Sequence, residues 1–293
     1  MSFNQKYSNI KSLVHEELDI IEKNMVSKIN VREPLNTFIR EFLMLPSKRI
    51  RSVLPLLYLK ADNQSVTHEQ IQILTAIELI HNASLIHDDV IDNSDMRRAH
   101  KTLSNEFDNK LAVISGDYIL SVVMQILTNL GSVELISKFS QTIEKMCVGE
   151  INQNFNRYKF GTIEEYIEKT KNKTAYLFEI SFMAVLMFAR KKYDCETLSK
   201  FALDTGIAFQ IRDDLLNLTD DDTSKPKNND IEDGIYNAPV IYSGQTEDLS
   251  QGIEKTRVLL NNYIKSARAN LIDLPDNEYK TALYDILELL NND

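Results

Sequence analysis

Apolar residues recur with the spacing of an α-helix through almost the whole chain, and no alternating strand pattern extends beyond a few residues. Residues that make tight turns are scarce: 8 Gly and 6 Pro among 293 residues, or about 5% where average proteins have ~12%. This composition disfavours turn-rich β folds and Gly-rich nucleotide-binding folds. The sequence therefore predicts an all-α protein, and without a composition break or linker we expect a single domain over residues 1–293.

The expected helices can be placed from their apolar faces and end signals. Thr67 suits a helix N-cap and Gln70 follows three residues later, as in a capping box. Polar, charged loops are expected at 93–109 and 219–237. The sequence predicts helices over 67–92, 111–130, 133–150, 162–190, 195–218, 254–266 and 278–290.

The charge balance limits the classes of partner. The formal net charge is −10, whereas a generic nucleic-acid binder carries a basic stripe. Cys147 and Cys195 form no CxxC pair, which favours a reducing compartment. The first residues contain no apolar signal-peptide core, and the longest apolar stretch, 180–189, is half of what a membrane crossing needs. We expect a soluble cytoplasmic protein that binds no nucleic acid and has no transmembrane segment.

One expected helix ends in a cluster of carboxylates. Asp88 and Asp92 are four residues apart, so they share a helix face, with Asp89 beside them. Acidic groups at a helix C-terminus are unfavourable to the helix dipole. Several carboxylate oxygens suit Mg²⁺, which is usually shared with substrate phosphates. This cluster therefore predicts a metal site.

A second long helix ends in the same way. Gln210, Asp213 and Asn217 lie along one face, with Asp214 next to Asp213. Alone, this pair fits an ordinary charged surface. Because two apolar helices each end in an aspartate pair followed by a polar loop, we expect both acidic ends to face one cavity.

Cations lie close to these motifs in the sequence. Arg97 and Arg98 follow the first acidic cluster, and a KRIR run contains Lys48 and Arg51. Arg suits bidentate phosphate contact and Lys suits contact as a point charge. His81 lies seven residues before Asp88, two turns earlier on the same helix face. The sequence therefore predicts a phosphate-binding group in an acidic protein.

The ordered segments KRIR, SLIHDDVIDNSDMRR, KTA and FQIRDDLLN resemble the trans-isoprenyl diphosphate synthase family over residues 48–240. The resemblance implies one large helical bundle around a deep central cavity, with the aspartate-rich helix ends at its mouth. It implies condensation of isopentenyl diphosphate with an allylic diphosphate, using Mg²⁺, three ions with substrate bound.

The resemblance also assigns roles to individual residues. Asp88, Asp89, Asp92 and Asp213 match the metal-binding aspartates. Lys173 and Thr174 match a Lys-Thr pair and Gln210 a glutamine, and the oxygen dipoles of Thr174 and Gln210 are expected to stabilise a carbocation. The residues matching diphosphate contacts are Lys48, Arg51, His81 and Arg98 for isopentenyl diphosphate, and Arg97 and Lys225 for the allylic substrate.

Some positions depart from the family pattern. Ser47 and Ser52 flank KRIR where Gly and Pro are usual, and Ala99 and His100 follow the Arg pair where Gly is expected. Asn217 stands in place of the third aspartate of the second motif, and the following loop is short, although Asp220, Asp221 and Asp222 lie nearby. These changes bear on turnover and metal affinity more than on fold.

Product length depends on the side chains one turn before Asp88. Ala83 and Ser84 are small, and with Ile80 on the same face they are expected to leave a hydrocarbon tunnel open; the alternative is that they are small for helix packing. A medium- or long-chain all-trans polyprenyl diphosphate is therefore expected. The local sequence resembles hexaprenyl and heptaprenyl diphosphate synthases, which implies a homodimer or a heterodimer with a small subunit.

Alternatives remain open at this point. One is a geranylgeranyl- or farnesyl-type short-chain synthase, and another is a weakly active or non-catalytic subunit. A terpene cyclase needs no isopentenyl diphosphate site, so Lys48, Arg51 and His81 count against it. Glu78 and His81 form an ExxH, but a di-iron bundle needs two such motifs, and the other four histidines have no Glu three residues before them.

Overall fold

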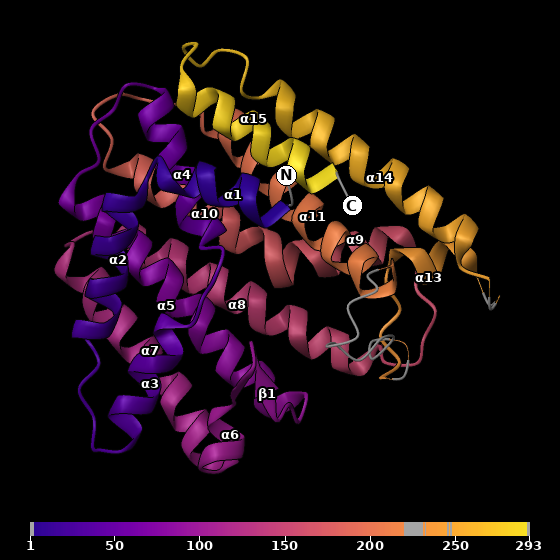
Figure 1. The fold of residues 1–293 in the computed structure, drawn as a ribbon, viewed down its shortest axis with the longest axis horizontal. Helices are drawn as coiled ribbons and strands as arrows, with labels where there is room; N and C mark the ends of the chain where they lie inside the picture. Colours follow the sequence, from indigo (N-terminus) through magenta and orange to yellow (C-terminus); the bar gives the residue numbers. More distant parts are fainter. Residues whose placement is uncertain (1–2, 220–230, 232, 245, 247, 292–293) are drawn as a thin grey trace. The chain divides into compact units, whose positions relative to one another are not determined.

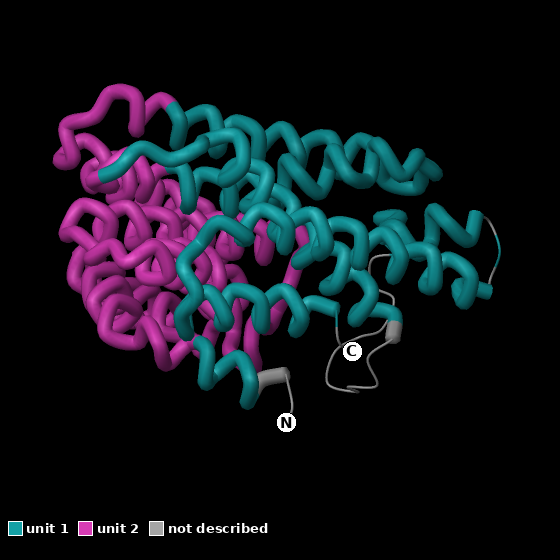
Figure 2. The backbone as a smooth tube through the Cα atoms, turned by 90° about the horizontal axis from the view of Figure 1, so that it is seen from above, with its two compact units in different colours: residues 1–10, 138–183, 191–293 teal, residues 11–137, 184–190 magenta. Residues whose placement is uncertain are grey.

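The computed structural model describes residues 3–219, 231, 233–244, 246 and 248–291. The chain divides into two compact units (Figure 2). Unit 1 comprises residues 1–10, 138–183 and 191–293, and unit 2 comprises residues 11–137 and 184–190.

The elements confirm the predicted all-α class, since the only strands among the described residues form one two-residue ladder (Figure 1). Unit 2 contains α2 (His15–Ser27), α3 (Leu35–Met44), α4 (Ile50–Ala61), α5 (His68–Ile91), β1 (Met96–Arg97), β2 (His100–Lys101), α6 (Leu103–Glu106) and α7 (Asn109–Asn129). Unit 1 contains α9 (Ile163–Thr170), η1 (Lys171–Ala175), α11 (Cys195–Thr219), α13 (Ala238–Ser243), α14 (Ser250–Ala269) and α15 (Glu278–Asn291). Three helices contain residues of both units: α1 (Phe3–Ser12), α8 (Val133–Phe155) and α10 (Tyr176–Met187).

Helix α5 is the central element of unit 2. The Thr67 hydroxyl accepts the backbone N–H of Gln70, and the Gln70 side chain accepts the N–H of Thr67, which confirms the predicted capping box. Most α5 side chains are buried, and the helix packs against α7 and α2. This burial on several sides holds its acidic C-terminal end in place.

Helix α7 is long and apolar enough to cross a membrane by length and composition, with 44% of the relevant window buried inside the protein. Its packing against α5 explains part of this apolar character. The two helices approach closely at Gly116, where an added Cβ would lie 2.2 Å from Nε2 of His87. A single helix of this kind is weak evidence for a membrane span, because core helices have the same composition.

The helical segment predicted over 162–190 is interrupted. A π-helical turn, η1, separates α9 from α10, and Lys173 and Thr174 lie within it. Gly206 of α11 lies against this turn, and a Cβ there would come within 2.7 Å of the Ala175 Cα. π-Helical turns inside α-helices frequently occur at functional sites.

The segment predicted as a loop over 93–109 has more structure than expected. β1 and β2 pair antiparallel, with Arg97 opposite His100, and α6 follows. The two residues that connect the strands, Arg98 and Ala99, both have positive φ, 51° and 62°. Positive φ at both central residues is the requirement of the type I′ turn, which is common in two-residue hairpins. The Arg pair therefore lies at the end of a tight hairpin and not in an irregular loop.

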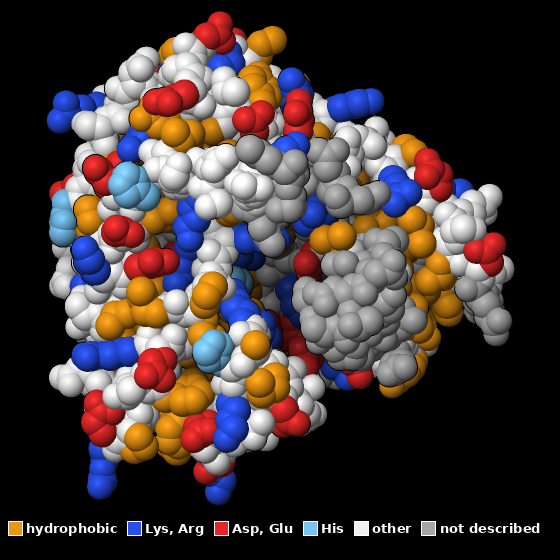
Figure 3. All heavy atoms as spheres, in the orientation of Figure 1, with side chains coloured by type: hydrophobic (Ala, Val, Ile, Leu, Met, Phe, Trp, Pro, Cys, Tyr) orange, Lys and Arg blue, Asp and Glu red, His pale blue; other side chains and the backbone are white. Residues whose placement is uncertain are grey.

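The surface carries both signs of charge. Figure 3 shows Lys and Arg side chains interspersed with Asp and Glu over the face that it draws. Such mixing is typical of a solvated surface and differs from the basic stripe of a nucleic-acid binder.

Candidate active site

The end of α5 brings one carboxylate of the first acidic cluster into the protein. Asp89 is buried, and its Oδ1 accepts hydrogen bonds from Arg97 Nε at 2.7 Å and Nη2 at 2.6 Å. Burial raises the pKa of Asp89, and the hydrogen bond and charge of Arg97 oppose that rise. Asp88 is half-buried, and Asp92, which ends the helix, is exposed.

The other oxygen of this carboxylate shows whether a metal fits. Oδ2 of Asp89 is buried and has no hydrogen-bond partner among the described residues. In the described part of the chain no three Asp, Glu, His or Cys side chains are grouped closely enough to hold an ion by themselves. These observations fit a Mg²⁺ ion that takes one or two carboxylates and completes its coordination with substrate phosphates and water.

A cationic cluster lies near the acidic end of α5. Burial lowers the pKa of the His81 imidazole well below its usual range, and Arg51, Arg98, Arg49 and Arg97 lower it further, in that order. The imidazole is therefore neutral near pH 7 and able to donate or accept a hydrogen bond. Burial also lowers the pKa of Arg51 to about 10, against the opposing charge of Glu78. Unit 2 thus brings together four of the predicted diphosphate contacts.

Lys48, the fifth predicted contact in this unit, is half-buried and directly precedes Arg49. Arg98 lies at the hairpin end, where partial desolvation of its guanidinium, together with Arg49 and Arg97, lowers its pKa. Guanidinium groups suit phosphate, because arginine matches phosphate oxygens with pairs of N–H donors, and a neutral imidazole can add a further hydrogen bond.

Unit 1 contains a chain of hydrogen bonds around the second acidic pair. The Thr174 hydroxyl donates to Gln210 Oε1 at 2.8 Å, Gln210 Nε2 donates to Asp214 Oδ1 at 2.9 Å, and the Tyr166 hydroxyl donates to Asp214 Oδ2 at 2.6 Å. Burial raises the pKa of Asp214 to about 7. Because both oxygens of Asp214 are occupied, the exposed Asp213 is the carboxylate of this pair that faces solvent.

Lys173 extends this network toward α8. Its ammonium group pairs with Glu150 Oε2 at 2.7 Å, and Gln153 donates to Glu150 Oε1 at 3.1 Å. Within the π-helical turn, Lys173 therefore forms an ion pair with Glu150, while the adjacent Thr174 hydrogen-bonds to Gln210. Sequence reasoning found these three predicted residues but missed Glu150 and Tyr166, for which no local pattern gave a signal.

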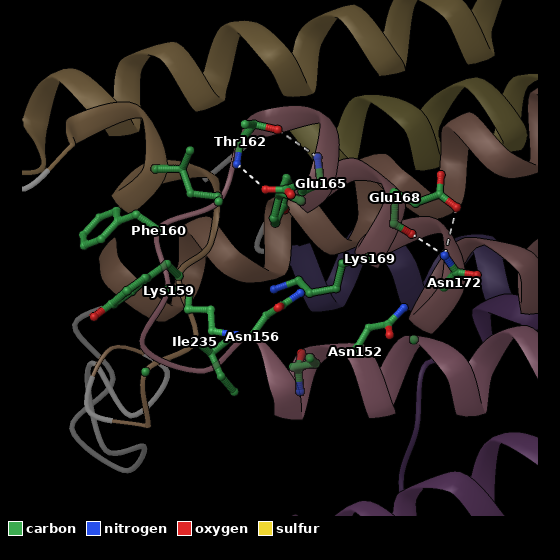
Figure 4. Close-up of a pocket in the computed structure, with 17 residues that line it drawn as sticks. Asn152, Asn156, Lys159, Phe160, Thr162, Glu165, Glu168, Lys169, Asn172 and Ile235 are labelled. Carbon is green, nitrogen blue, oxygen red and sulfur yellow. Dashed lines mark hydrogen bonds between the residues drawn. The ribbon is translucent and has the colours of Figure 1, made fainter.

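A cavity of about 360 Å³ lies beside the network, between α8, α9 and residues 234–241 (Figure 4). Lys169 of α9, Asn152 of α8 and Asn156, which directly follows α8, point into it, and Lys169 donates to Asn237 at 3.0 Å. Tyr166 lines the cavity and connects it to Asp214. None of the predicted site residues lines this cavity, so it is not the substrate tunnel expected from the sequence.

The predicted tunnel residues differ in their exposure. Ala83 is completely buried and Ile80 is 2% exposed, whereas Ser84 is half-buried and donates its hydroxyl to the His81 carbonyl at 2.9 Å. Lys225 and the nearby Asp220, Asp221 and Asp222 lie outside the described residues. Asn217 is exposed near the end of α11.

Comparisons with known proteins agree with these features. A family model described as polyprenyl synthetase matches residues 32–271. A prenyl transferase of Cyanophora paradoxa is 32% identical over 307 residues, covering 94% of this chain and 95% of the relative. Heptaprenyl diphosphate synthase component 2 of Bacillus subtilis is 31% identical over 244 residues, covering 81% of this chain and 70% of the relative.

The fold has a counterpart among solved structures. The decaprenyl diphosphate synthase from Rhodobacter capsulatus superimposes with a TM-score of 0.87 at 22% identity, over 97% of this chain and 98% of that chain. Fold and site together define an all-α enzyme of the prenyltransferase class. The chain belongs to the polyprenyl synthetase family.

Proposed function

We propose that this protein is a Mg²⁺-dependent trans-prenyltransferase that condenses isopentenyl diphosphate with an allylic diphosphate to give a medium- or long-chain all-trans polyprenyl diphosphate. The observation that carries the proposal is the cationic cluster around the neutral His81 in unit 2. Such a cluster has the charge to bind a diphosphate. An enzyme that ionises a single diphosphate substrate, such as a terpene cyclase, would need no diphosphate site besides the metal site at the acidic end of α5.

The two units supply complementary parts of the reaction. Arg51, His81 and Arg98 bind isopentenyl diphosphate, with Lys48 beside them, and Arg97 binds the allylic diphosphate next to Asp89. Asp88, Asp89, Asp92 and Asp213 would hold the Mg²⁺ ions, three with substrate bound, and this metal would supply positive charge to neutralise the departing pyrophosphate.

Unit 1 stabilises the allylic carbocation. The oxygens of Thr174 and Gln210 form part of a fixed hydrogen-bond chain, so their dipoles need no reorganisation when positive charge develops. Lys173 is held by Glu150 and adds a fixed positive charge for the pyrophosphate. The double bond of isopentenyl diphosphate attacks the carbocation, and the departing pyrophosphate takes the proton, so no protein nucleophile is needed.

The expected product is longer than farnesyl or geranylgeranyl diphosphate. No aromatic ring stands one turn before Asp88, where Ala83 and Ser84 are found. The name of the Bacillus subtilis relative, a heptaprenyl synthase component, supports both a longer product and work with a partner subunit.

We propose an oligomer that uses the outer face of α7. Leu111, Val113, Ile114 and Met124 are large apolar side chains that remain exposed on this helix. Exposed apolar residues grouped on one helix are typical of a protein–protein contact. Two copies of this chain fit such a contact, and so does a small second subunit. The cytoplasm is the proposed location, since Cys147 and Cys195 are both free and exposed.

The experiment is to incubate purified protein with Mg²⁺, labelled isopentenyl diphosphate and geranyl, farnesyl or geranylgeranyl diphosphate, and to separate the products by chain length. We expect products beyond twenty carbons, and none when isopentenyl diphosphate or Mg²⁺ is omitted. Cyclised product from the allylic substrate alone would indicate a terpene cyclase. Absence of product that is reversed by a partner subunit would identify a two-component enzyme, and short products would favour a farnesyl- or geranylgeranyl-type synthase.

A further inference from the structure

The KRIR run contains an arginine that points away from solvent. Arg49 is 4% exposed, and its guanidinium donates through Nε to Glu22 at 3.1 Å, through Nη1 to Glu78 at 3.3 Å and through Nη2 to the Leu43 carbonyl. Its backbone is left-handed, with φ of 52°, at the N-cap of α4. Arg49 is therefore fixed at both its side chain and its backbone.

Glu78 is the buried partner of this arginine. It is 1% exposed and lies on α5, one turn before His81. Its Oε2 accepts from Arg49, and its Oε1 accepts from the Ser52 hydroxyl at 2.7 Å. One carboxylate thus holds the residue before α4 and a residue in its first turn.

These contacts connect the two segments that carry the cationic cluster, namely the KRIR run before and within α4 and the part of α5 that contains His81. Arg49 and Ser52 stand directly beside Lys48 and Arg51 in the sequence, so fixing the first pair fixes the backbone that carries the second. His81 lies on the same helix as Glu78. The negative charge of Glu78 also favours the protonated forms of Arg51 and Arg98, because it raises the pKa of both guanidinium groups.

We propose that Glu78 is a positioning residue for isopentenyl diphosphate: through Arg49 and Ser52 it sets where Lys48 and Arg51 stand relative to His81. The inference rests on the proposed function of this cluster. It gives the ExxH formed by Glu78 and His81 a meaning other than iron binding. Glu78 anchors the α4 segment, and His81 contacts the substrate.

Stability alone does not explain this arrangement. Replacing a buried ion pair by apolar side chains of similar volume is often neutral or stabilising, because both charges must be removed from water. The ion pair does restrain geometry, however. Because the buried Glu78 carboxylate accepts from two donors, Arg49 and Ser52, it fixes the position of the first turn of α4. The role we assign to Glu78 is geometric and electrostatic.

The test compares Glu78→Gln, Glu78→Asp and Ser52→Ala with the parent enzyme, with KM measured separately for each substrate. Loss of one charged hydrogen bond at this position should raise the KM for isopentenyl diphosphate about tenfold in Glu78→Gln. The KM for the allylic diphosphate and the rate of its metal-dependent hydrolysis without isopentenyl diphosphate should stay within about twofold. Glu78→Asp should recover part of the loss, and Ser52→Ala should show a smaller increase of the same KM.

The matched control is Glu17→Gln. Glu17 pairs with Lys60 of α4 at 2.8 Å, so this variant also removes an ion pair that holds α4, but outside the cluster. Its KM values should remain at those of the parent. Thermal unfolding of each variant separates a loss of fold from a loss of positioning.

Three results would overturn the inference: an unchanged KM for isopentenyl diphosphate in Glu78→Gln, an equal rise of both KM values, or the same selective rise in Glu17→Gln. If Glu78→Gln does not fold, Ser52→Ala decides, since its hydroxyl contacts the same carboxylate. Calorimetric titration of each variant with isopentenyl diphosphate reports binding without turnover. A parent protein that binds this ligand but makes no product would contradict the proposed function and leave the positioning role in place.

Discussion

The ends of α5 and α11 carry the same Asp-Asp pair, yet the buried aspartates have different surroundings. Asp89 is held by Arg97, a cation, and its second oxygen lacks a partner among the described residues. Asp214 is held by Tyr166 and Gln210, two neutral donors, and burial raises its pKa to about 7. In the first pair, Oδ2 of the buried Asp89 can therefore accept a ligand. In the second pair, both oxygens of the buried Asp214 are used in hydrogen bonds within the protein.

The comparison predicts which aspartates are essential for catalysis. Asp88→Asn and Asp213→Asn each remove a carboxylate expected to hold Mg²⁺, and kcat should fall about 10³-fold, as for other losses of transition-state charge stabilisation. Asp214→Asn should lower kcat far less, since Asn still offers an amide to the same network. Single-turnover rates with saturating Mg²⁺ measure both effects.

The control for this comparison is Asp19→Asn, which alters an exposed aspartate of α2. It should leave kcat unchanged. Equal losses in Asp213→Asn and Asp214→Asn would contradict the division of roles within the second pair.

The second prediction concerns pH. The pKa of Asp214 is raised in the folded protein from 3.8 to about 7, so the native state binds more protons than the unfolded state between these values. Stability is therefore retained at low pH and lost as pH rises toward 7. For this one group the loss between pH 5 and pH 8 should be about 3 kcal/mol.

The measurement is the free energy of unfolding from urea titrations at pH 5 and pH 8, for the parent and for Asp214→Asn. The variant lacks the titrating group. The free energy of unfolding of the variant minus that of the parent should therefore increase by about 3 kcal/mol between pH 5 and pH 8. Parallel pH curves for the two proteins would show that Asp214 does not titrate in this range.

The third prediction tests the neutral donor itself. Tyr166→Phe removes the hydroxyl that donates to Asp214 Oδ2 and should lower the free energy of unfolding by about 2 kcal/mol, because a buried carboxylate oxygen loses its partner. The melting temperature should fall by several degrees. Tyr158→Phe, at a side chain that is 67% exposed, is the control. A melting temperature equal in the two variants would mean that Asp214 finds another donor.

The contrast between the two pairs also shows what the sequence can predict. The helices themselves follow from a repeating apolar pattern, and the Asp88–Asp92 spacing places both on one helix face. Other contacts join residues that lie far apart in the chain: Tyr166 is 48 residues from Asp214, and Arg49 is 29 residues from Glu78. No periodicity encodes such contacts, because they depend on how helices pack.

Local exceptions limited the sequence reading as well. The hairpin at Arg97–His100 was not predicted, since its strands have two residues each and its turn uses Arg98 and Ala99 instead of Asn-Gly. The π-helical turn of Lys173 and Thr174 leaves no mark in the sequence pattern. Both exceptions carry predicted site residues, in line with the tendency of functional positions to break local rules.

One turn before each Asp pair the two helices differ again, and this difference gives the last prediction, with the smallest change in free energy. At four residues before the first aspartate, α5 has Ser84 and α11 has Phe209, whose ring packs on Phe178 with centroids 5.7 Å apart. Ser84→Tyr adds an aromatic ring at a half-buried position of α5, and should shorten the product with kcat within about threefold. Ala83→Tyr instead enters a fully buried position and should cost roughly 1–3 kcal/mol of stability through overpacking. Product chromatography and thermal unfolding of the two variants separate the effects. A shortened product from Ala83→Tyr alone would assign the chain-length role to Ala83 and not to Ser84.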